Sequence, residues 1–303
     1  MTTDRTPLPP LDSVKGWFAP VDQLLFTWFL ERQARKSTRG DLVELGAYLG
    51  KSAILIGHHR APDETFTVCD LFGSDAPDAD NQLEVSISYA SLTRKAFESN
   101  YLRFHAELPK VLQAPTSVIL DHVSPGSCRF VHVDASHLYA HVQADIAAAK
   151  TVLVTDGIVV CDDYRTEHTP GVAAAVWEAV LNRGLQPICL TRQKLYGSWS
   201  GATEIQEDLL EWLSGRTDLW HEVQTIADRP VVRIKATATP PGPSAQDAER
   251  SRLEQQLTAS DQARRSLKRQ LAAVSGSRSY RIGRLLTSPV RALRRVWRRM
   301  RGG

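Results

Sequence analysis

Acidic side chains follow two apolar runs in the second half of the chain. One run ends at Asp134, and another ends at the adjacent pair Asp162 and Asp163. Because neighbouring strands of a parallel sheet deliver their carboxyl ends to one edge, we expect these three carboxylates to converge. Gathered carboxylates repel one another unless a cation neutralises them, and oxygen donors favour a hard divalent ion. The pattern predicts an Mg²⁺ site with open positions for substrate; a solvated turn at residues 162–163 is the competing interpretation.

A glycine turn precedes a helical segment near residue 50. The pattern of a strand, a turn and a helix start appears in Glu44-Leu45-Gly46-Ala47-Tyr48-Leu49-Gly50-Lys51-Ser52. Such a turn brings backbone N–H groups and a helix N-terminus close to a ligand. A Walker A loop needs one more residue between its glycines, and the dinucleotide motif needs a glycine where Tyr48 stands. An acid-x-Gly-x-x-x-Gly pattern remains, unless the glycines only allow a tight turn.

The elements that position these residues follow from the alternation of short apolar runs with helical segments, which is typical of a doubly wound sheet. We expect seven strands, at residues 41–45, 66–69, 101–105, 129–133, 157–161, 186–191 and 230–234. Crossover helices are expected at residues 52–59, 86–98, 139–150 and 171–182, and a covering helix at 21–35. The predicted fold class is α/β, Rossmann-like and doubly wound, with a mostly parallel seven-stranded sheet.

Charge divides the chain into two regions. Residues 240–303 contain 15 Arg or Lys against 4 Asp or Glu, a net charge of +11, and the total of 37 basic and 34 acidic residues leaves 22 against 30, or −8, for the rest. We expect a covering helix region at 1–40, the main domain at 41–235 and a linker at 236–244. A helical or coiled-coil segment at 245–274 and an Arg-rich amphipathic tail at 275–303 complete the predicted organisation.

Composition narrows the class of protein. Hydrophobic residues make up 42% of the chain and charged residues 23%, which argues against a disordered, collagenous or disulfide-scaffold protein. The chain lacks an apolar run of 18 residues and a signal-like start, so we expect a cytoplasmic protein without a membrane span. Its four cysteines are too far apart for a metal knuckle and are expected to be buried thiols.

The glycine turn also resembles the cofactor site of class I S-adenosylmethionine (SAM) methyltransferases. The resemblance includes Asp70, 26 residues after Glu44 and at the end of the second expected strand. It implies that Glu44, Gly46 and Gly50 form the methionine end of a SAM site. It also implies that the Asp70 carboxylate accepts hydrogen bonds from the ribose hydroxyls.

The acidic segments resemble, more specifically, the metal-dependent sugar O-methyltransferases of the macrocin and mycinamicin group. The likeness is carried by Asp134-x-x-His137 and Asp162-Asp163, within about residues 41–180. It implies that the three aspartates are ligands of Mg²⁺ and that His137 is the general base. A packed or helix-capping role is the alternative for His137. The sequence departs from the group where an acid should contact adenine, and Glu107 is the one candidate there.

Two further segments have competing interpretations. Residues 194–201, with Tyr196 and Trp199, fit either the wall of an acceptor pocket or a hairpin between the last strands. The acidic segment 73–88 fits a solvated loop or a lid over the site.

The residues and the resemblance together predict an O-methyltransferase that uses SAM and Mg²⁺ and acts on a sugar hydroxyl of a secondary metabolite or a cell-surface glycan. The alternatives are an enzyme for a catechol-like hydroxyl and a non-catalytic, membrane-recruited scaffold. Apolar residues at helical spacing among the tail arginines predict peripheral contact with an anionic membrane at the inner face of the cell membrane. A specific nucleic-acid partner is not expected; a solubilising tail and a homo-oligomer remain open.

Overall fold

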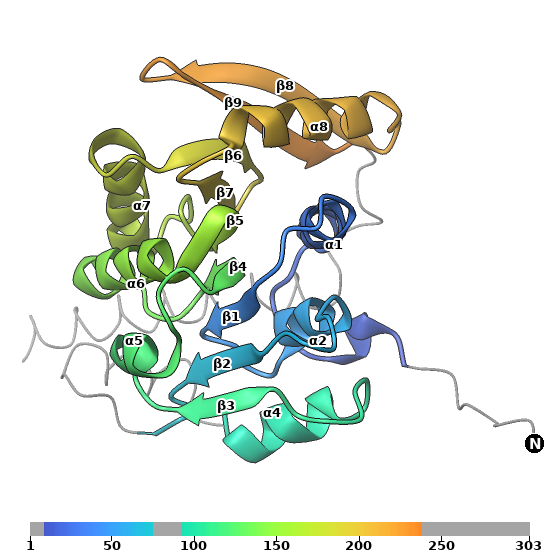
Figure 1. The fold of residues 1–303 in the computed structure, drawn as a ribbon, viewed down its shortest axis with the longest axis vertical. Helices are drawn as coiled ribbons and strands as arrows, with labels where there is room; N and C mark the ends of the chain where they lie inside the picture. Colours follow the sequence, from blue (N-terminus) through green and yellow to red (C-terminus); the bar gives the residue numbers. More distant parts are fainter. Residues whose placement is uncertain (1–8, 75–91, 238–303) are drawn as a thin grey trace, which may run out of the picture. The chain divides into compact units, whose positions relative to one another are not determined.

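The computed structural model describes residues 9–74 and 92–237, and within them a nine-stranded sheet forms the centre of the fold (Figure 1). The strand order is β3-β2-β1-β4-β5-β7-β6-β9-β8. The strands are β1 (Asp41–Leu45), β2 (Phe66–Asp70), β3 (Lys110–Gln113), β4 (Cys128–Val133), β5 (Leu153–Cys161), β6 (Gln186–Leu190), β7 (Leu195–Ser198), β8 (Leu219–Ile226) and β9 (Arg229–Ala236).

The sheet is mixed but largely parallel. Strands β3, β2, β1, β4 and β5 run parallel to one another, while β7 is antiparallel to both β5 and β6. Strand β9 is parallel to β6, and β8 closes the edge as an antiparallel partner of β9. The connections change direction between β1 and β4, which is where an open α/β sheet forms its ligand crevice. The Rossmann-like α/β class is confirmed.

Two aspects of the sequence prediction are wrong. The expected strand at 101–105 is the end of helix α4 (Arg94–Tyr101) and the turn after it, and the true strand β3 follows at Lys110–Gln113. The apolar character of that segment reflects Phe104 packing into the core. The sheet also has nine strands in the described ranges instead of seven, because β7 and β8 were not recognised.

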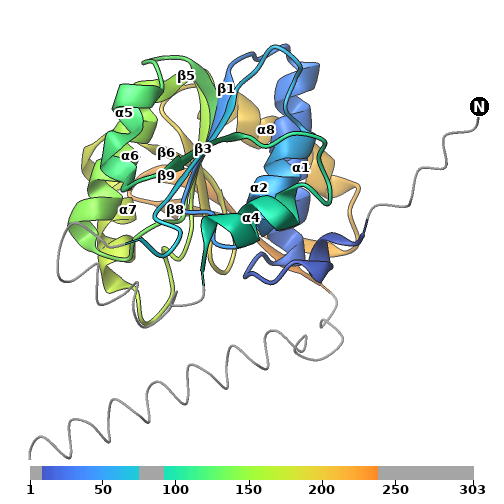
Figure 2. The ribbon, with the colours of Figure 1, turned by 90° about the horizontal axis from the view of Figure 1, so that it is seen from below.

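Helices cover both faces of the sheet (Figures 1 and 2). One face carries α1 (Pro20–Arg35), α2 (Lys51–His58), α4 and α8 (Ala202–Ser214), and the other carries α5 (Ile119–His122), α6 (Tyr139–Val152) and α7 (Pro170–Asn182). Short 3₁₀ turns lie at Leu11–Ser13 and Thr116–Val118. The predictions of α1, α2, α6 and α7 are confirmed to within two residues. The predicted helix at 86–98 is observed from Arg94, and its residues 86–91 lie outside the described residues.

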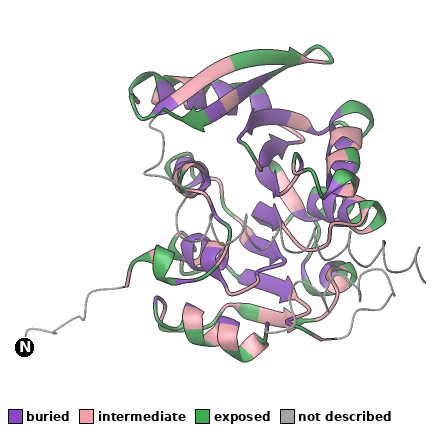
Figure 3. Ribbon diagram, turned by 180° about the vertical axis from the view of Figure 1, so that it is seen from behind, coloured by how far each residue is buried: buried purple, intermediate pink, exposed green. Residues whose placement is uncertain are grey.

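Each face of the sheet has its own hydrophobic core, so the central strands are buried on both sides (Figure 3). Helix α1 begins at Pro20, where the fixed φ of proline suits a first helical turn. Its Phe26 packs edge-on against Phe130 of β4, and its Phe29 stacks on Tyr196 of β7 with ring centroids 5.1 Å apart. These contacts fix α1 over the strands that carry the acidic residues.

None of the helices in the described ranges combines the length and apolar composition that a bilayer-spanning helix requires. The described residues end at residue 237. The predicted coiled-coil segment and Arg-rich tail, nearly all of the linker and most of the acidic segment 73–88 therefore lie outside them.

Candidate functional site

The glycine turn after β1 is shaped by close approaches of the chain. Gly46 has a φ of 82°, and a Cβ atom there would lie 2.0 Å from the backbone oxygen of Asp134. Gly50 caps the start of α2 with a φ of 91°, and a Cβ there would lie 3.0 Å from the Phe97 ring. Glycine is needed at both positions because the backbone is left-handed and the space is filled. The turn thus brings the N-terminus of α2 to the carboxyl edge of the sheet.

Asp70, at the end of β2, holds this turn in place. Its Oδ2 accepts hydrogen bonds from the backbone N–H groups of Ala47 at 2.7 Å and Tyr48 at 3.0 Å, and its Oδ1 accepts one from Phe72 at 2.7 Å. Burial raises the pKa of the carboxyl above its usual value, and the three N–H donors oppose that rise. The structure therefore brings Asp70, Gly46 and Gly50 together, as the sequence predicted.

Glu44 lies deeper than a ligand-contacting role suggests. Its side chain is fully buried on β1, and its Oε1 lies 2.8 Å from Nδ1 of His132 on the neighbouring strand β4. Burial raises the pKa of Glu44 to about 8, while the Ser52 hydroxyl and the Lys194 ammonium act in the opposite direction. Glu44 thus supports the turn from below, inside the core that α1 covers.

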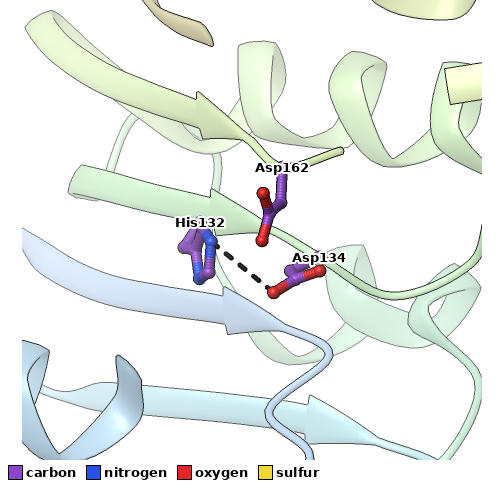
Figure 4. A group of neighbouring side chains, drawn as sticks. All are labelled: His132, Asp134 and Asp162. Carbon is purple, nitrogen blue, oxygen red and sulfur yellow. Dashed lines mark ion pairs between the residues drawn. The ribbon is translucent and has the colours of Figure 1, made fainter. Parts of the chain in front are cut away.

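Two of the three predicted acidic residues converge. Asp134 follows β4 and Asp162 follows β5, and their carboxylate oxygens and a ring nitrogen of His132 all lie within 4.8 Å of one another (Figure 4). Burial and the neighbouring Asp162 charge raise the pKa of Asp134 well above its usual value. The dashed contact in Figure 4 joins His132 Nε2 to Asp134 Oδ2 at 3.9 Å. It involves a neutral imidazole, because burial lowers the pKa of His132 well below its usual value.

Asp163 turns toward His137 instead. Its backbone is left-handed, with a φ of 54°, and its Oδ2 lies 3.5 Å from Nε2 of His137. Both residues line a small pocket together with Asp134 and Asp162. The remaining lining residues are Val133, Ala135, Ser136, Val142, Cys161 and Val172. The predicted base and all three predicted metal ligands thus share one pocket, although only two aspartates face each other.

Lys194, in the turn between β6 and β7, and His132 belong to this cluster, although the sequence analysis assigned neither of them a role in it. The Lys194 ammonium is buried, forms an ion pair with Asp162 and lies 3.1 Å from Nε2 of His132. Burial alone lowers the pKa of a lysine, but the nearby carboxylates, Asp162 foremost, raise the pKa of Lys194 above its usual value. The place of Lys194 in a polar turn between two strands gave no signal in the sequence that its side chain is buried. Its ammonium is the protein's own countercharge for the acidic residues.

The hydrogen-bond roles of His132 follow from this lysine. An ammonium only donates, so Nε2 of His132 accepts from Lys194 and the proton lies on Nδ1, which donates to Glu44. Glu44, His132, Lys194 and Asp162 therefore form a continuous buried chain. It joins the first residue of the glycine-turn motif to the acidic residues after β5.

The positions of residues 195–198 and of Glu107 in the fold bear on two further interpretations of the sequence. Residues 195–198 are a strand of the sheet, and Tyr196 is fully buried with its hydroxyl 2.8 Å from Asp22 Oδ1, so the hairpin interpretation is correct and Tyr196 does not line an acceptor pocket. Glu107 is exposed and precedes β3. It therefore lies near the amino end of that strand, at the opposite edge of the sheet from the glycine turn, which does not support a contact with adenine.

Together, the strand order, the glycine turn after β1 and the acid after β2 define a Rossmann-like α/β protein, a class whose members bind ligands at the carboxyl edge of the sheet. Residues 43–164, from β1 to just beyond β5, match a family described as "Methyltransferase domain". This part of the chain, less than half of its 303 residues, is similar to a methyltransferase domain, and its Rossmann-like topology agrees with that similarity.

Solved structures with similar folds include several methyltransferases. The O-methyltransferase NovP is 19% identical over 59% of this chain and 79% of its own, with a TM-score of 0.49. CalS11, a TDP-rhamnose 3′-O-methyltransferase of calicheamicin biosynthesis, is 14% identical over 61% and 82%, with a TM-score of 0.42. The O-methyltransferase TomG from Streptomyces achromogenes is 14% identical over 72% and 78%, with a TM-score of 0.34. No curated protein matches the chain significantly. The similarity of this chain to methyltransferases therefore depends on the family match.

Proposed function

We propose that the protein is a SAM-dependent O-methyltransferase whose acceptor is a hydroxyl group of a sugar, in a secondary metabolite or a cell-surface glycan. The observation that carries the proposal is the contact between Gly46 and the backbone of Asp134. This contact places the glycine turn directly beside the pocket that holds His137. A donor bound at the turn and an acceptor bound in the pocket would therefore meet.

On the donor side, we assign the methionine end of SAM to the turn between Gly46 and Gly50 and the ribose to Asp70. The Asp70 carboxylate already accepts two N–H groups of the turn, so the same side chain that binds the ribose also sets the shape of the turn. Glu44 lies beneath the turn and contacts His132, so in this proposal it is a positioning residue and does not touch the donor.

On the acceptor side, we assign the general base to His137. An aliphatic hydroxyl is a weak nucleophile at neutral pH, so proton removal must accompany the attack. The hydroxyl oxygen forms a bond to the donor methyl carbon as the carbon–sulfur bond breaks, and the hydroxyl proton passes to the His137 imidazole. Asp163, 3.5 Å from Nε2 of His137, stabilises the resulting imidazolium.

The carboxylates of this pocket fit a hard divalent cation. Oxygens of Asp134 and Asp162 lie within 4.8 Å of each other, and the Asp134 side chain is 31% exposed, so an ion can reach it from solvent. We propose that these two residues hold Mg²⁺, with Asp163 at the wall of the same pocket. When bound, Mg²⁺ lowers the pKa of the acceptor hydroxyl. The sugar acceptor itself is supported by the Asp134-x-x-His137 and Asp162-Asp163 elements of the sequence.

Calorimetric titration of SAM into the full chain, with and without Mg²⁺, tests this function. We expect binding to the wild type, loss of binding in Asp70→Ala, and unchanged binding in Asp121→Ala, which removes an exposed carboxylate of α5. Retained affinity in Asp70→Ala would refute the donor site. Absence of binding to the wild type would overturn the methyltransferase proposal, and binding without turnover on a panel of sugars and catechols would favour a scaffold.

We also propose that the Arg-rich tail brings the enzyme to an anionic membrane surface. Arginines interspersed with apolar residues support this proposal, since such segments bind between lipid headgroups. Flotation with anionic vesicles should recover the full chain but not a chain ending at Lys235. Equal flotation of both would exclude the membrane role.

A further inference from the structure

The Lys194 ammonium is buried beside the acidic residues Asp134 and Asp162. Its side chain is 2% exposed and forms its ion pair with Asp162, one of the two carboxylates proposed to bind Mg²⁺. The rings of Phe18 and Phe26 lie 5.7 Å and 5.9 Å from Nζ and close the side away from the strands. A buried ammonium in this position balances part of the charge of the acidic cluster without help from solvent.

The side chains of His132, Asp134 and Asp162 form one cluster, and Lys194 contacts two of them. Nζ contacts a carboxylate oxygen of Asp162 and also Nε2 of His132 at 3.1 Å. Asp134, which also lines the pocket, is the more accessible carboxylate of the cluster, because 31% of its side chain is exposed against 8% for Asp162. A divalent cation that enters from the pocket therefore meets Asp134 first and must share Asp162 with the ammonium.

Like charges in a desolvated site repel strongly, so an ammonium next to a shared carboxylate opposes the arrival of a second cation. The same ammonium keeps the two aspartates assembled when no metal is bound, because it offsets their mutual repulsion. Both effects come from the protein's own charge and need no change in backbone.

We infer that Lys194 is a built-in counter-ion that competes with a divalent cation for Asp162, and thereby keeps the metal affinity of the site low. This inference rests on the proposed metal site. It adds that Lys194 sets the Mg²⁺ concentration at which the site fills. An enzyme of this design would respond to the free Mg²⁺ concentration, because the ion must displace or outcompete an ammonium that is always present.

The test measures binding of Mn²⁺, an Mg²⁺ substitute detected by electron paramagnetic resonance, to the full chain without donor or acceptor. The Lys194→Met variant replaces the ammonium with an unbranched apolar side chain, and Lys194→Gln is a second neutral variant. We expect at least tenfold tighter Mn²⁺ binding in either neutral variant than in the wild type. Lys36→Met, which removes an exposed lysine paired with Glu204, should leave Mn²⁺ binding unchanged.

A double variant locates the effect. Adding Asp162→Asn to Lys194→Met should abolish the gain in affinity, because the shared carboxylate is then absent. Unchanged or weaker Mn²⁺ binding in the neutral variants would overturn the inference, and so would a gain that survives Asp162→Asn. If neither neutral variant folds without metal, recovery of the fold on refolding with Mn²⁺ supports the inference and failure to recover overturns it.

This experiment remains separate from the proposed function. Mn²⁺ binding is measured without SAM, so a protein that fails to bind SAM in calorimetry still reports whether Lys194 controls metal affinity. Conversely, the wild type could bind SAM while the Lys194 variants bind Mn²⁺ no more tightly than the wild type does. That result would overturn the inference on Lys194 but leave the methyltransferase proposal standing.

Discussion

Replacing Gly46 with alanine tests whether the glycine turn and the acidic pocket depend on each other. Two separate costs are expected: a left-handed backbone at φ 82° and a Cβ atom 2.0 Å from the Asp134 carbonyl oxygen. Gly184 provides a matched control, because its φ is 77° and a Cβ there would meet nothing within 4 Å. Gly184→Ala therefore carries the backbone cost alone, whereas Gly46→Ala carries both.

The magnitudes follow from these two terms. A left-handed conformation costs an L-residue about 1–2 kcal/mol, and this cost applies to both variants. Forcing an extra carbon into filled space adds about 1–3 kcal/mol, and it applies to Gly46 alone. The displaced atom belongs to the Asp134 backbone, whose N–H donates to Leu45 O at 2.7 Å in the pairing of β1 with β4. We therefore expect Gly46→Ala to be the less stable variant by about 1–3 kcal/mol, since the unfolded-state entropy change is shared.

Urea unfolding of both variants measures the stability difference, and calorimetry with SAM measures its effect on the site. We expect the Gly184→Ala protein to bind SAM as the wild type does, and the Gly46→Ala protein to lose at least tenfold in affinity at temperatures where it is folded. Equal loss of stability in the two variants would show that the approach to Asp134 is not rigid. Full SAM affinity in Gly46→Ala would remove the turn from the donor site.

Three further predictions concern single side chains. Arg129→Met leaves Glu64 buried without its two-pronged partner and should cost about 3–5 kcal/mol of unfolding free energy; urea titration measures this, and the added change Glu64→Leu should restore part of it. Burial raises the pKa of Asp22 from 3.8 to about 6, so its contribution to stability is present below pH 4 and is lost as pH rises through 6. Relative to Asp22→Asn, the wild type should therefore lose about 2 kcal/mol between pH 4 and 6 and about 3 kcal/mol in total by pH 8, and parallel pH profiles would contradict this. His137→Asn should lower the turnover number by about 10²–10⁴ while leaving SAM affinity intact, and a turnover within a few-fold of wild type would exclude it as the base.

The sequence was sufficient where a residue's role depends on strand ends and tight turns. The positions of Gly46, Asp70, Asp134 and Asp162 at one edge of the sheet, though not their functional roles, could be predicted because parallel strands bring their carboxyl ends to the same edge. Asp163 follows Asp162 after β5, but its side chain turns toward His137 because its backbone is left-handed. The sequence pattern does not encode this local conformation.

The remaining errors have identifiable physical causes. Strand β3 is a partly exposed edge strand, so its residues lack the apolar run that marks a buried strand, and the apolar segment before it is a helix end that packs into the core. Strand β8 is likewise an edge strand with several exposed positions. The role of Lys194 depends on the antiparallel insertion of β7 beside β5, a contact between residues distant in sequence.

If the proposed methyltransferase function holds, the contact of Gly46 with Asp134 also limits how the protein's acceptor specificity can be engineered. Since the turn and the strand end are in backbone contact, the spacing between the two half-sites is a fixed dimension that side-chain changes will not adjust. Variation of acceptor choice must therefore come from pocket residues outside this junction, such as Ser136, Val142 and Val172. A library randomised at these three positions explores acceptor size and polarity while leaving the donor geometry unaltered.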